Sequence, residues 1–216
     1  MGIPERKERE FLRREQEILD AAMRLFSRDD WQAVTIEEIA QASEIGKGTI
    51  YKHFPSKEDI YARFALVFNR KLLDRLRTVD TSQDTLMQLR SIIRAFWEFH
   101  LSSPEYHHLV QYCGREDFRR TVSEETRAEI LELDQEFNIL IAALVQAGIE
   151  EGVFPRNKPL PLLLFGAQAA LFGAVRMAGG GCAQLMGTET TSEEFLEELT
   201  EFIVTGLTQA RQQAQR

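Results

Sequence analysis

Cysteine is scarce in this chain, because only Cys113 and Cys182 occur among its 216 residues. Two thiols so far apart in sequence do not form the disulfide framework of a small secreted domain, and free thiols in a reducing compartment are expected instead. The N-terminus is charged and no apolar run follows it, so no secretory signal is expected. We therefore expect a cytoplasmic protein.

Motifs for catalysis are also missing. The sequence contains no phosphate-binding loop, no glycine-rich dinucleotide turn, no nucleophile elbow and no zinc-binding helix. The glycines at 179–181 follow a helical pattern and precede no strand pattern, so they are interpreted as a flexible break. We predict that the protein is not an enzyme and has no catalytic residue, cofactor or metal.

Alternating strand patterns are absent as well, whereas apolar residues recur at helical spacing through most of the chain. The fold class is therefore predicted to be all-α. The pattern divides the chain into an N-terminal three-helix helix-turn-helix domain (residues 1–56), a linking helix (57–80) and a C-terminal helical bundle (81–216). The linking helix would span about 30 Å and act as the lever between the two domains.

The N-terminal part is organised around residues 35–54. Thr35 and Glu38 have the spacing of a capping box, and apolar residues then follow on one helix face. After a break near Glu44, a second and very short pattern places Ile50 and Phe54 on one face. The other face holds cations, a hydroxyl and aromatic groups, which are side chains that reach phosphates and base edges. The predicted DNA-binding residues are Thr35, Lys47, Gly48, Thr49, Tyr51, Lys52, His53 and Lys57.

The run TIEEIAQASEIGKGTIYKHFPSKEDI, at residues 35–60, resembles the DNA-binding segment of TetR-type transcriptional regulators. The likeness is most specific at GTIYKHF followed by SKE, and it extends loosely from about Glu15 to Leu76. It implies a dimer that reads a palindromic DNA operator, and a small-molecule inducer bound within the C-terminal helices. An ordinary helical hairpin in an all-α core is the alternative, but it does not explain the cations on so short a helix.

Two residues depart from the pattern of this family. The family usually has glycine in the turn and serine or threonine as the cap of the second helix, whereas this chain has Glu44 and Gly46. Glutamate is a poor choice for a turn residue with positive φ, and it puts an anion near the DNA. We therefore expect weaker DNA binding or a slightly different turn.

The net charge of −8 is confined to the C-terminal part. Residues 1–80 hold 15 basic and 15 acidic residues, whereas residues 81–216 hold 11 and 19. A neutral domain with a local basic stripe still binds DNA, because affinity depends on the cations that face phosphates. The mixed charges before residue 16 are interpreted as a solvated helix start with i,i+4 pairs, or as a basic arm that touches phosphates or the minor groove.

A long apolar run occupies residues 160–177. The 17 residues between Lys158 and Arg176 include two prolines and are at the short limit for a membrane span. We prefer a helix buried in a core or an oligomer. With the last helix, residues 192–211, it is predicted to form a four-helix dimer interface, as TetR-type proteins do. The predicted dimer residues are Phe165, Ala169, Gly173, Phe195, Leu199, Phe202, Ile203 and Gly206.

The inducer implied by the resemblance would meet a mainly apolar lining in the C-terminal helices. Aromatic residues at helical spacing are also ordinary core residues, so both interpretations stay open. Arg176 would meet an acidic ligand or a carboxylate across the bundle. A metal site at His107 and His108 is disfavoured, since adjacent helical side chains point about 100° apart. The predicted effector residues are Phe96, Trp97, His100, Tyr106, His107, Tyr112, Phe137, Gln168, Phe172 and Arg176.

The sequence therefore predicts a DNA-binding transcriptional regulator without a membrane partner. We expect a homodimeric repressor that a small hydrophobic effector releases from a double-stranded DNA operator. The alternative is an all-α lipid- or acyl-binding protein whose helix-turn-helix is vestigial. Nothing in the sequence separates repression from activation.

Overall fold

The computed structural model describes residues 3–28, 30–155, 160–179 and 191–208. Within those ranges the chain is helical and has no strand, which confirms the predicted all-α class. Two of the three consecutive glycines, Gly180 and Gly181, and the second cysteine, Cys182, lie outside the described residues. The chain forms two compact units, one from Met1–Phe68 with His108–Leu131, and one from Asn69–His107 with Glu132–Arg216.

The two units each combine segments that are distant in sequence. Helices α4 (Lys57–Arg77) and α7 (Glu124–Glu150) each begin in the first unit and end in the second. The predicted division at residues 56 and 80 separates segments by their expected functions and not by their packing, so it stays a prediction.

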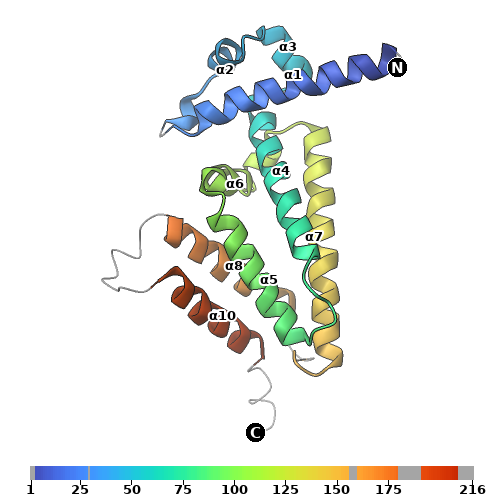
Figure 1. The fold of residues 1–216 in the computed structure, drawn as a ribbon, viewed down its shortest axis with the longest axis vertical. Coiled ribbons are helices and arrows are strands. Elements are labelled where there is room, and N and C mark those ends of the chain that lie inside the picture. Colours follow the sequence, from blue (N-terminus) through green and yellow to red (C-terminus); the bar gives the residue numbers. More distant parts are fainter. Residues whose placement is uncertain (1–2, 29, 156–159, 180–190, 209–216) are drawn as a thin grey trace. The chain divides into compact units, whose positions relative to one another are not determined.

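The first unit contains the predicted helix-turn-helix. Its elements are α1 (Ile3–Phe26), the 3-10 turn η1 (Trp31–Ala33), α2 (Ile36–Ser43), α3 (Lys47–His53), the start of α4, α6 (His107–Cys113), η3 (Phe118–Arg120) and the start of α7 (Figure 1). Apolar side chains from α1, α2, α3 and α4 close its core. The buried set includes Ile18, Ala22, Phe26, Ile39, Ile50, Phe54 and Ile60.

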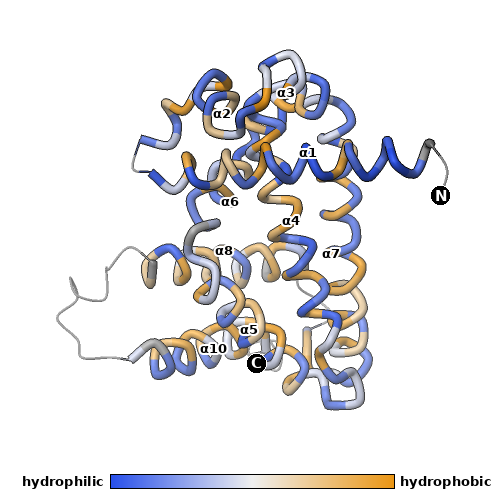
Figure 2. Tube along the Cα trace, turned by 45° about the horizontal axis from the view of Figure 1, so that its top comes forward, coloured by the Kyte–Doolittle hydropathy of each residue, from blue (hydrophilic) through white to orange (hydrophobic). Residues whose placement is uncertain are grey.

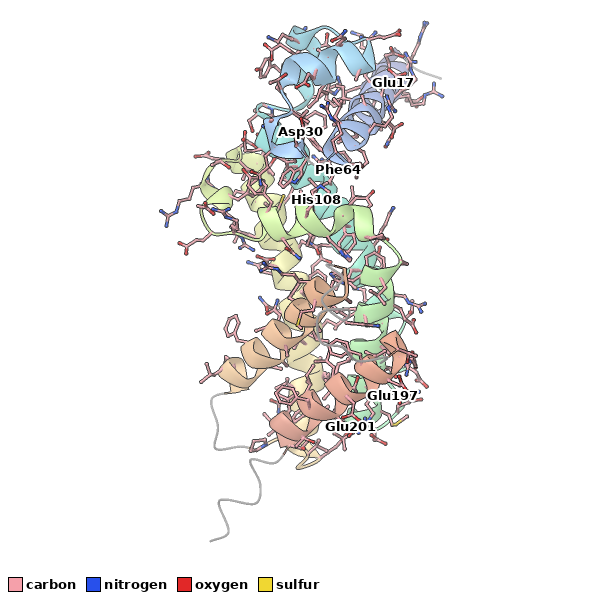
Figure 3. The ribbon with its side chains drawn as sticks, turned by 90° about the vertical axis from the view of Figure 1, so that its left-hand side faces the viewer. Glu17, Asp30, Phe64, His108, Glu197 and Glu201 are labelled. Atoms are coloured by element: carbon pink, nitrogen blue, oxygen red, sulfur yellow. The ribbon has the colours of Figure 1, made fainter. Side chains whose placement is uncertain are left out.

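An aromatic cluster around Trp31 joins α6 to the rest of the first unit. The Trp31 ring meets Tyr61 and Tyr112 edge-on, at centroid distances of 5.4 and 5.2 Å. The Tyr61 hydroxyl donates to the Trp31 carbonyl at 3.0 Å. His108, labelled in Figure 3, donates from Nε2 to the carbonyl of Phe26 at 2.9 Å. The end of α1 and the start of α6 are thereby held together.

The second unit is a helical bundle. It contains α5 (Thr85–Leu101), the turn η2 (Pro104–Tyr106), α8 (Leu160–Gly179), α10 (Ser192–Thr208) and the later parts of α4 and α7. Helices α5, α8 and α10 pack on one another (Figure 1). Trp97 is 2% exposed in this core and lies 5.7 Å from the ring of Phe195. Glu201, labelled in Figure 3, pairs with Arg90 on the surface of the unit.

The first turns of α1 are hydrophilic, as Figure 2 shows. Arg13 pairs with Glu17 at 2.9 Å, and Arg14 pairs with Glu10 at 2.9 Å. These are the i,i+4 pairs expected of a solvated helix start, and exposed pairs of this kind stabilise a helix only slightly.

Candidate nucleic-acid interface

Helix α2 begins with the predicted capping box. The Thr35 hydroxyl accepts from the Glu38 backbone N–H at 3.2 Å, and the Glu38 carboxylate accepts from the Thr35 N–H at 2.8 Å. Hydrogen bonds from the backbone N–H and the hydroxyl of Thr35 hold the pKa of Glu38 below its usual value. This reciprocal cap fixes where α2 starts and therefore where the following turn and α3 lie.

In the turn between α2 and α3, Glu44 adopts the positive φ for which glutamate is a poor choice. Glu44 is left-handed, with φ 56° and ψ 26°, and its N–H donates to the carbonyls of Ala40 and Gln41. Among the described non-glycine residues it alone has positive φ. Gly46 then takes the extended N-cap conformation, with no side chain to cap α3. The chain thus keeps the helix-turn-helix backbone with residues that do not favour it.

Replacing Glu44 with glycine should stabilise the first unit by about 1 kcal/mol, because glycine adopts the left-handed conformation without the steric cost of a Cβ. Glu44→Ala is the matched control, because it removes the charge but keeps the strained conformation. Urea denaturation of both variants measures the effect. An equal gain in Glu44→Ala would show that the carboxylate, and not the backbone, is the source of the cost.

The outer face of α3 presents the groups expected of a DNA-reading helix. Tyr51 is 51% exposed, Lys52 is exposed beside it, and Ile50 is fully buried beneath them. A Cβ placed at Gly48 would meet no atom within 4 Å, so this part of the helix lies open for close approach of another backbone. Thr49 is half-buried on the same helix.

Two predicted phosphate ligands already have partners within the first unit. Lys47 pairs with the carboxylate of Glu37 at the start of α2. Lys57 donates from Nζ to the carbonyls of Gln32 and Val34, at 2.8 and 2.9 Å. The ion pair of Lys47 and Glu37 is exposed and adds little stability, so a phosphate can take the place of the Glu37 carboxylate. The Lys57 ammonium stabilises the connection between η1 and α2, a role that sequence spacing does not reveal. Whether Lys57 also contacts phosphate stays a prediction.

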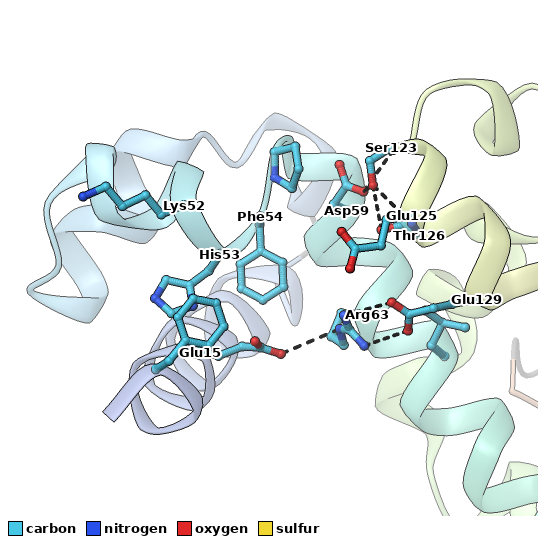
Figure 4. A pocket seen from close by; sticks show the side chains of 13 residues that line it. Glu15, Lys52, His53, Phe54, Asp59, Arg63, Ser123, Glu125, Thr126 and Glu129 are labelled. Atoms are coloured by element: carbon cyan, nitrogen blue, oxygen red, sulfur yellow. Dashed lines mark hydrogen bonds and ion pairs between the residues drawn. The ribbon is translucent and has the colours of Figure 1, made fainter. Parts of the chain in front are cut away.

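His53 ends α3 and faces α1 rather than outward. Its ring lies 4.0 Å from the ring of Phe11, and burial lowers its pKa from the usual 6.5 although Glu15 opposes the shift. Both rings border a cavity of about 180 Å³ between α1, the α3–α4 connection and the start of α7 (Figure 4). Across this cavity Arg63 pairs with Glu129 at 3.0 Å. Whether His53 contacts DNA stays a prediction.

The predicted effector residues are divided between the two units and differ in burial. Phe96, Trp97 and His100 are buried in the core of the second unit, and Phe172 meets Phe96 edge-on at 5.2 Å. Tyr112 belongs to the first unit and packs in the Trp31 cluster. In the second unit Phe137, Tyr106 and His107 are half-buried, whereas Gln168 and Arg176 are exposed. Their assignment to an effector stays a prediction.

Five of the eight predicted dimer residues are exposed on α8 and α10, and we call them the exposed strip: Phe165, Ala169, Gly173, Phe202 and Gly206. Phe165 is 67% exposed and Phe202 is 71% exposed, whereas Ile203 is only 4% exposed and belongs to the core. A Cβ at Gly173 would meet no atom within 4 Å. Leu162, at 68% exposure, extends the strip and was not predicted, although it precedes Phe165 by one helical turn.

Among the described side chains, no group of three or more His, Cys, Asp or Glu is arranged to hold a metal ion. No helix in the described ranges is long and apolar enough to cross a membrane.

Comparison with known proteins identifies the class of this one as a DNA-binding transcriptional regulator. Residues 18–64 match bacterial regulatory proteins of the tetR family, and residues 82–173 match the tetracyclin repressor-like C-terminal domain. Together these matches cover well over half of the chain. The chain therefore belongs to the TetR family, as the run at residues 35–60 predicts.

Individual relatives agree with this assignment. The HTH-type transcriptional repressor KstR2 of Rhodococcus jostii is 28% identical over 142 residues, which are 65% of this chain and 68% of that protein. The structure of the ketosteroid transcriptional regulator KstR2 of Mycobacterium tuberculosis matches with a TM-score of 0.66 at 20% identity, over 90% of this chain and 95% of that one. The fatty acid degradation regulator FadR of Bacillus halodurans matches with a TM-score of 0.66 at 19% identity, over 90% and 96%. At such identities the two structures show a shared fold alone.

Proposed function

We propose that this regulator is a dimeric repressor that leaves its DNA operator when a small hydrophobic effector binds. The observation that supports the DNA contact best is the surface of α3. It is a very short helix whose outer face exposes Tyr51 and Lys52 and whose inner face is anchored by Ile50. A helix of this kind fits the major groove, where a phenol and an ammonium reach base edges and phosphates.

The exposed strip on α8 and α10 supports a twofold dimer. Leu162, Phe165 and Phe202 are each more than two-thirds exposed in a single chain. Large apolar side chains gathered in this way mark an interaction surface. A second copy of the chain would cover the same strip on both protomers, and two α3 helices would then read the two halves of a palindromic site.

Gly173→Ala should weaken this dimer roughly tenfold, a loss of about 1.4 kcal/mol. In a single protomer the new methyl group meets open space, and alanine favours a helix by about 1 kcal/mol over glycine, so the fold itself should not lose stability. Sedimentation equilibrium gives the dimer affinity, and urea denaturation gives the stability. Gln146→Ala, on an exposed face of α7, is the control. An unchanged dimer affinity in Gly173→Ala would place the dimer interface elsewhere.

A hydrophobic effector is supported by the aromatic character of the second unit. Phe96 and Phe172 meet edge-on, and His100 stacks on Phe96 at 4.1 Å. Among the proteins of similar fold, one is named as a ketosteroid regulator and another as a regulator of fatty acid degradation. Ketosteroids and fatty acids are both largely apolar compounds. The effector would release DNA only through different affinities for the DNA-bound and free conformations. Native mass spectrometry of the purified protein would show whether a ligand of this kind is bound.

The test of the proposed function is selection of duplexes from a random DNA pool, followed by fluorescence anisotropy with the selected and the unselected duplexes. A repressor enriches a palindromic sequence and prefers it strongly over random DNA. Weak binding that ignores sequence would instead favour a lipid- or acyl-binding protein with a vestigial helix-turn-helix.

Two substitutions on α3 should separate phosphate contact from base reading. Lys52→Ala should weaken binding to all sequences and lower the salt slope by about one unit, because one cation no longer faces a phosphate. Tyr51→Ala should instead change the preferred sequence, with roughly tenfold less discrimination at one position. Lys52→Arg keeps the charge and is the control. An unaltered sequence preference in Tyr51→Ala would remove Tyr51 from base reading.

A further inference from the structure

The first turns of α1 extend beyond the other helices of the first unit. Helix α1 has 24 residues, but its buried positions begin only at Ile18. Residues 5–9 are all exposed, and in Figures 1 and 2 this end of α1 runs on past α3. A short helix without tertiary contacts is marginal in water. Here the ion pairs of Glu10 with Arg13 and Arg14 help to stabilise the helix where this extension begins.

Phe11 connects this extension to the DNA-reading helix. Its ring lies 4.0 Å from that of His53, the last residue of α3, and the same cavity is bordered by Lys52. Lys7 precedes Phe11 by four residues and therefore lies one turn further out on the same side of α1. The extension thus departs from the carboxyl end of α3.

The cations of this extension fall into two groups. Arg13 and Arg14 are engaged by the carboxylates of Glu10 and Glu17. Arg6 and Lys7 are exposed, and among the described residues neither takes part in an ion pair. Arg9 donates to the backbone carbonyl of Glu5 at 3.3 Å, so its guanidinium retains further donors.

We propose that Arg6, Lys7 and Arg9 bind the DNA phosphates that flank the groove occupied by α3. This inference rests on the proposed DNA-binding function and adds a second contact surface to it. Residues 3–10 span about 12 Å of helix, which is about the width of the major groove. A helix that leaves the end of α3 at this length reaches the sugar–phosphate backbone at the edge of the groove. Lysine and arginine on an exposed helix bind such phosphates without reading sequence.

The test compares the wild-type protein with the full-chain variant R6A/K7A/R9A on the duplex selected by the wild type. One form of the duplex keeps its flanking sequence, and the other is trimmed to the core site. On the long form the variant should bind roughly tenfold more weakly, with a salt slope lower by about one unit for each removed cation that faces a phosphate. On the trimmed form the two proteins should bind alike. Alanine favours helix, so circular dichroism should show no loss of helix in the variant.

The charge-conserving variant R6K/R9K is the control and should keep the wild-type affinity and salt slope. Equal affinity and slope of R6A/K7A/R9A and wild type on the long duplex would overturn the inference. An equal decrease in affinity on both duplexes would overturn it too, because the phosphates concerned would then lie within the core site. If the wild-type protein binds no duplex at all, the proposed DNA-binding function itself is wrong, and this inference falls with it.

Discussion

Lowering the pH from neutrality to about 4 should destabilise the second unit by about 3 kcal/mol through one residue, His100. Its side chain is 2% exposed and its Nδ1 donates to the carbonyl of Phe96 at 2.9 Å. Burial lowers the pKa of His100 from 6.5 to about 4, an effect that the hydrogen bond to Phe96 opposes. At a pH between these two pKa values, His100 is protonated in the unfolded chain but neutral in the folded chain. Stability is therefore complete above about pH 6.5 and is lost as the pH falls.

Urea denaturation at a series of pH values measures this effect. His100→Phe keeps an aromatic ring against Phe96 but cannot take up a proton, so its stability should vary less over the same pH range. His53→Phe in the first unit is the control, and its stability should still fall with pH as His100 predicts. Parallel pH curves for the wild type and His100→Phe would exclude His100 as the source.

Asp59→Ala should destabilise the first unit by about 3 kcal/mol, because it removes a buried, charged acceptor of several hydrogen bonds. Asp59 is 3% exposed. One carboxylate oxygen accepts from the Ser123 N–H at 3.1 Å and from the Ser123 hydroxyl at 2.7 Å, and the other accepts from the Ser56 hydroxyl at 2.5 Å. The side chain therefore ties the first turn of α4 to the residue that precedes α7. Its removal leaves the partly buried N–H of Ser123 without this acceptor.

Asp80→Ala is the matched control, because Asp80 also accepts from a serine N–H and hydroxyl, those of Ser82, but on the exposed surface. It should cost far less stability than Asp59→Ala, because surface substitutions usually have small effects. Burial raises the pKa of Asp59, but the hydrogen bonds outweigh this and leave it below its usual 3.8. The stability that Asp59 adds is therefore present above about pH 4 and is lost as the pH falls further. Equal stabilities of the Asp59→Ala and Asp80→Ala variants would contradict this role.

Local sequence signals predicted the helix-turn-helix closely. The capping box of Thr35 and Glu38, the shared buried face of Ile50 and Phe54, and the unfavourable position of Glu44 all depend on neighbours within a few residues. The linking helix also follows from local periodicity, and it appears in the structure as α4, from Lys57 to Arg77.

Local sequence signals do not predict contacts between segments that are distant in sequence. No local pattern shows that Lys57 binds the carbonyls of Gln32 and Val34, because 25 and 23 residues separate them. Tyr112 and the rest of His108–Leu131 belong to the first unit although they follow the predicted linking helix by many residues. Exposed apolar positions such as Leu162 are likewise visible only once the packed faces of α8 are known.

The two tryptophans of this chain are divided between its units. Trp31 lies in the aromatic cluster of the first unit, and Trp97 is buried in the core of the second. The fluorescence emission of each indole therefore reports on its own unit. With one tryptophan replaced by phenylalanine, the other becomes a single intrinsic optical probe. The DNA binding proposed for the first unit and the effector binding proposed for the second could then be recorded separately, without a chemical dye.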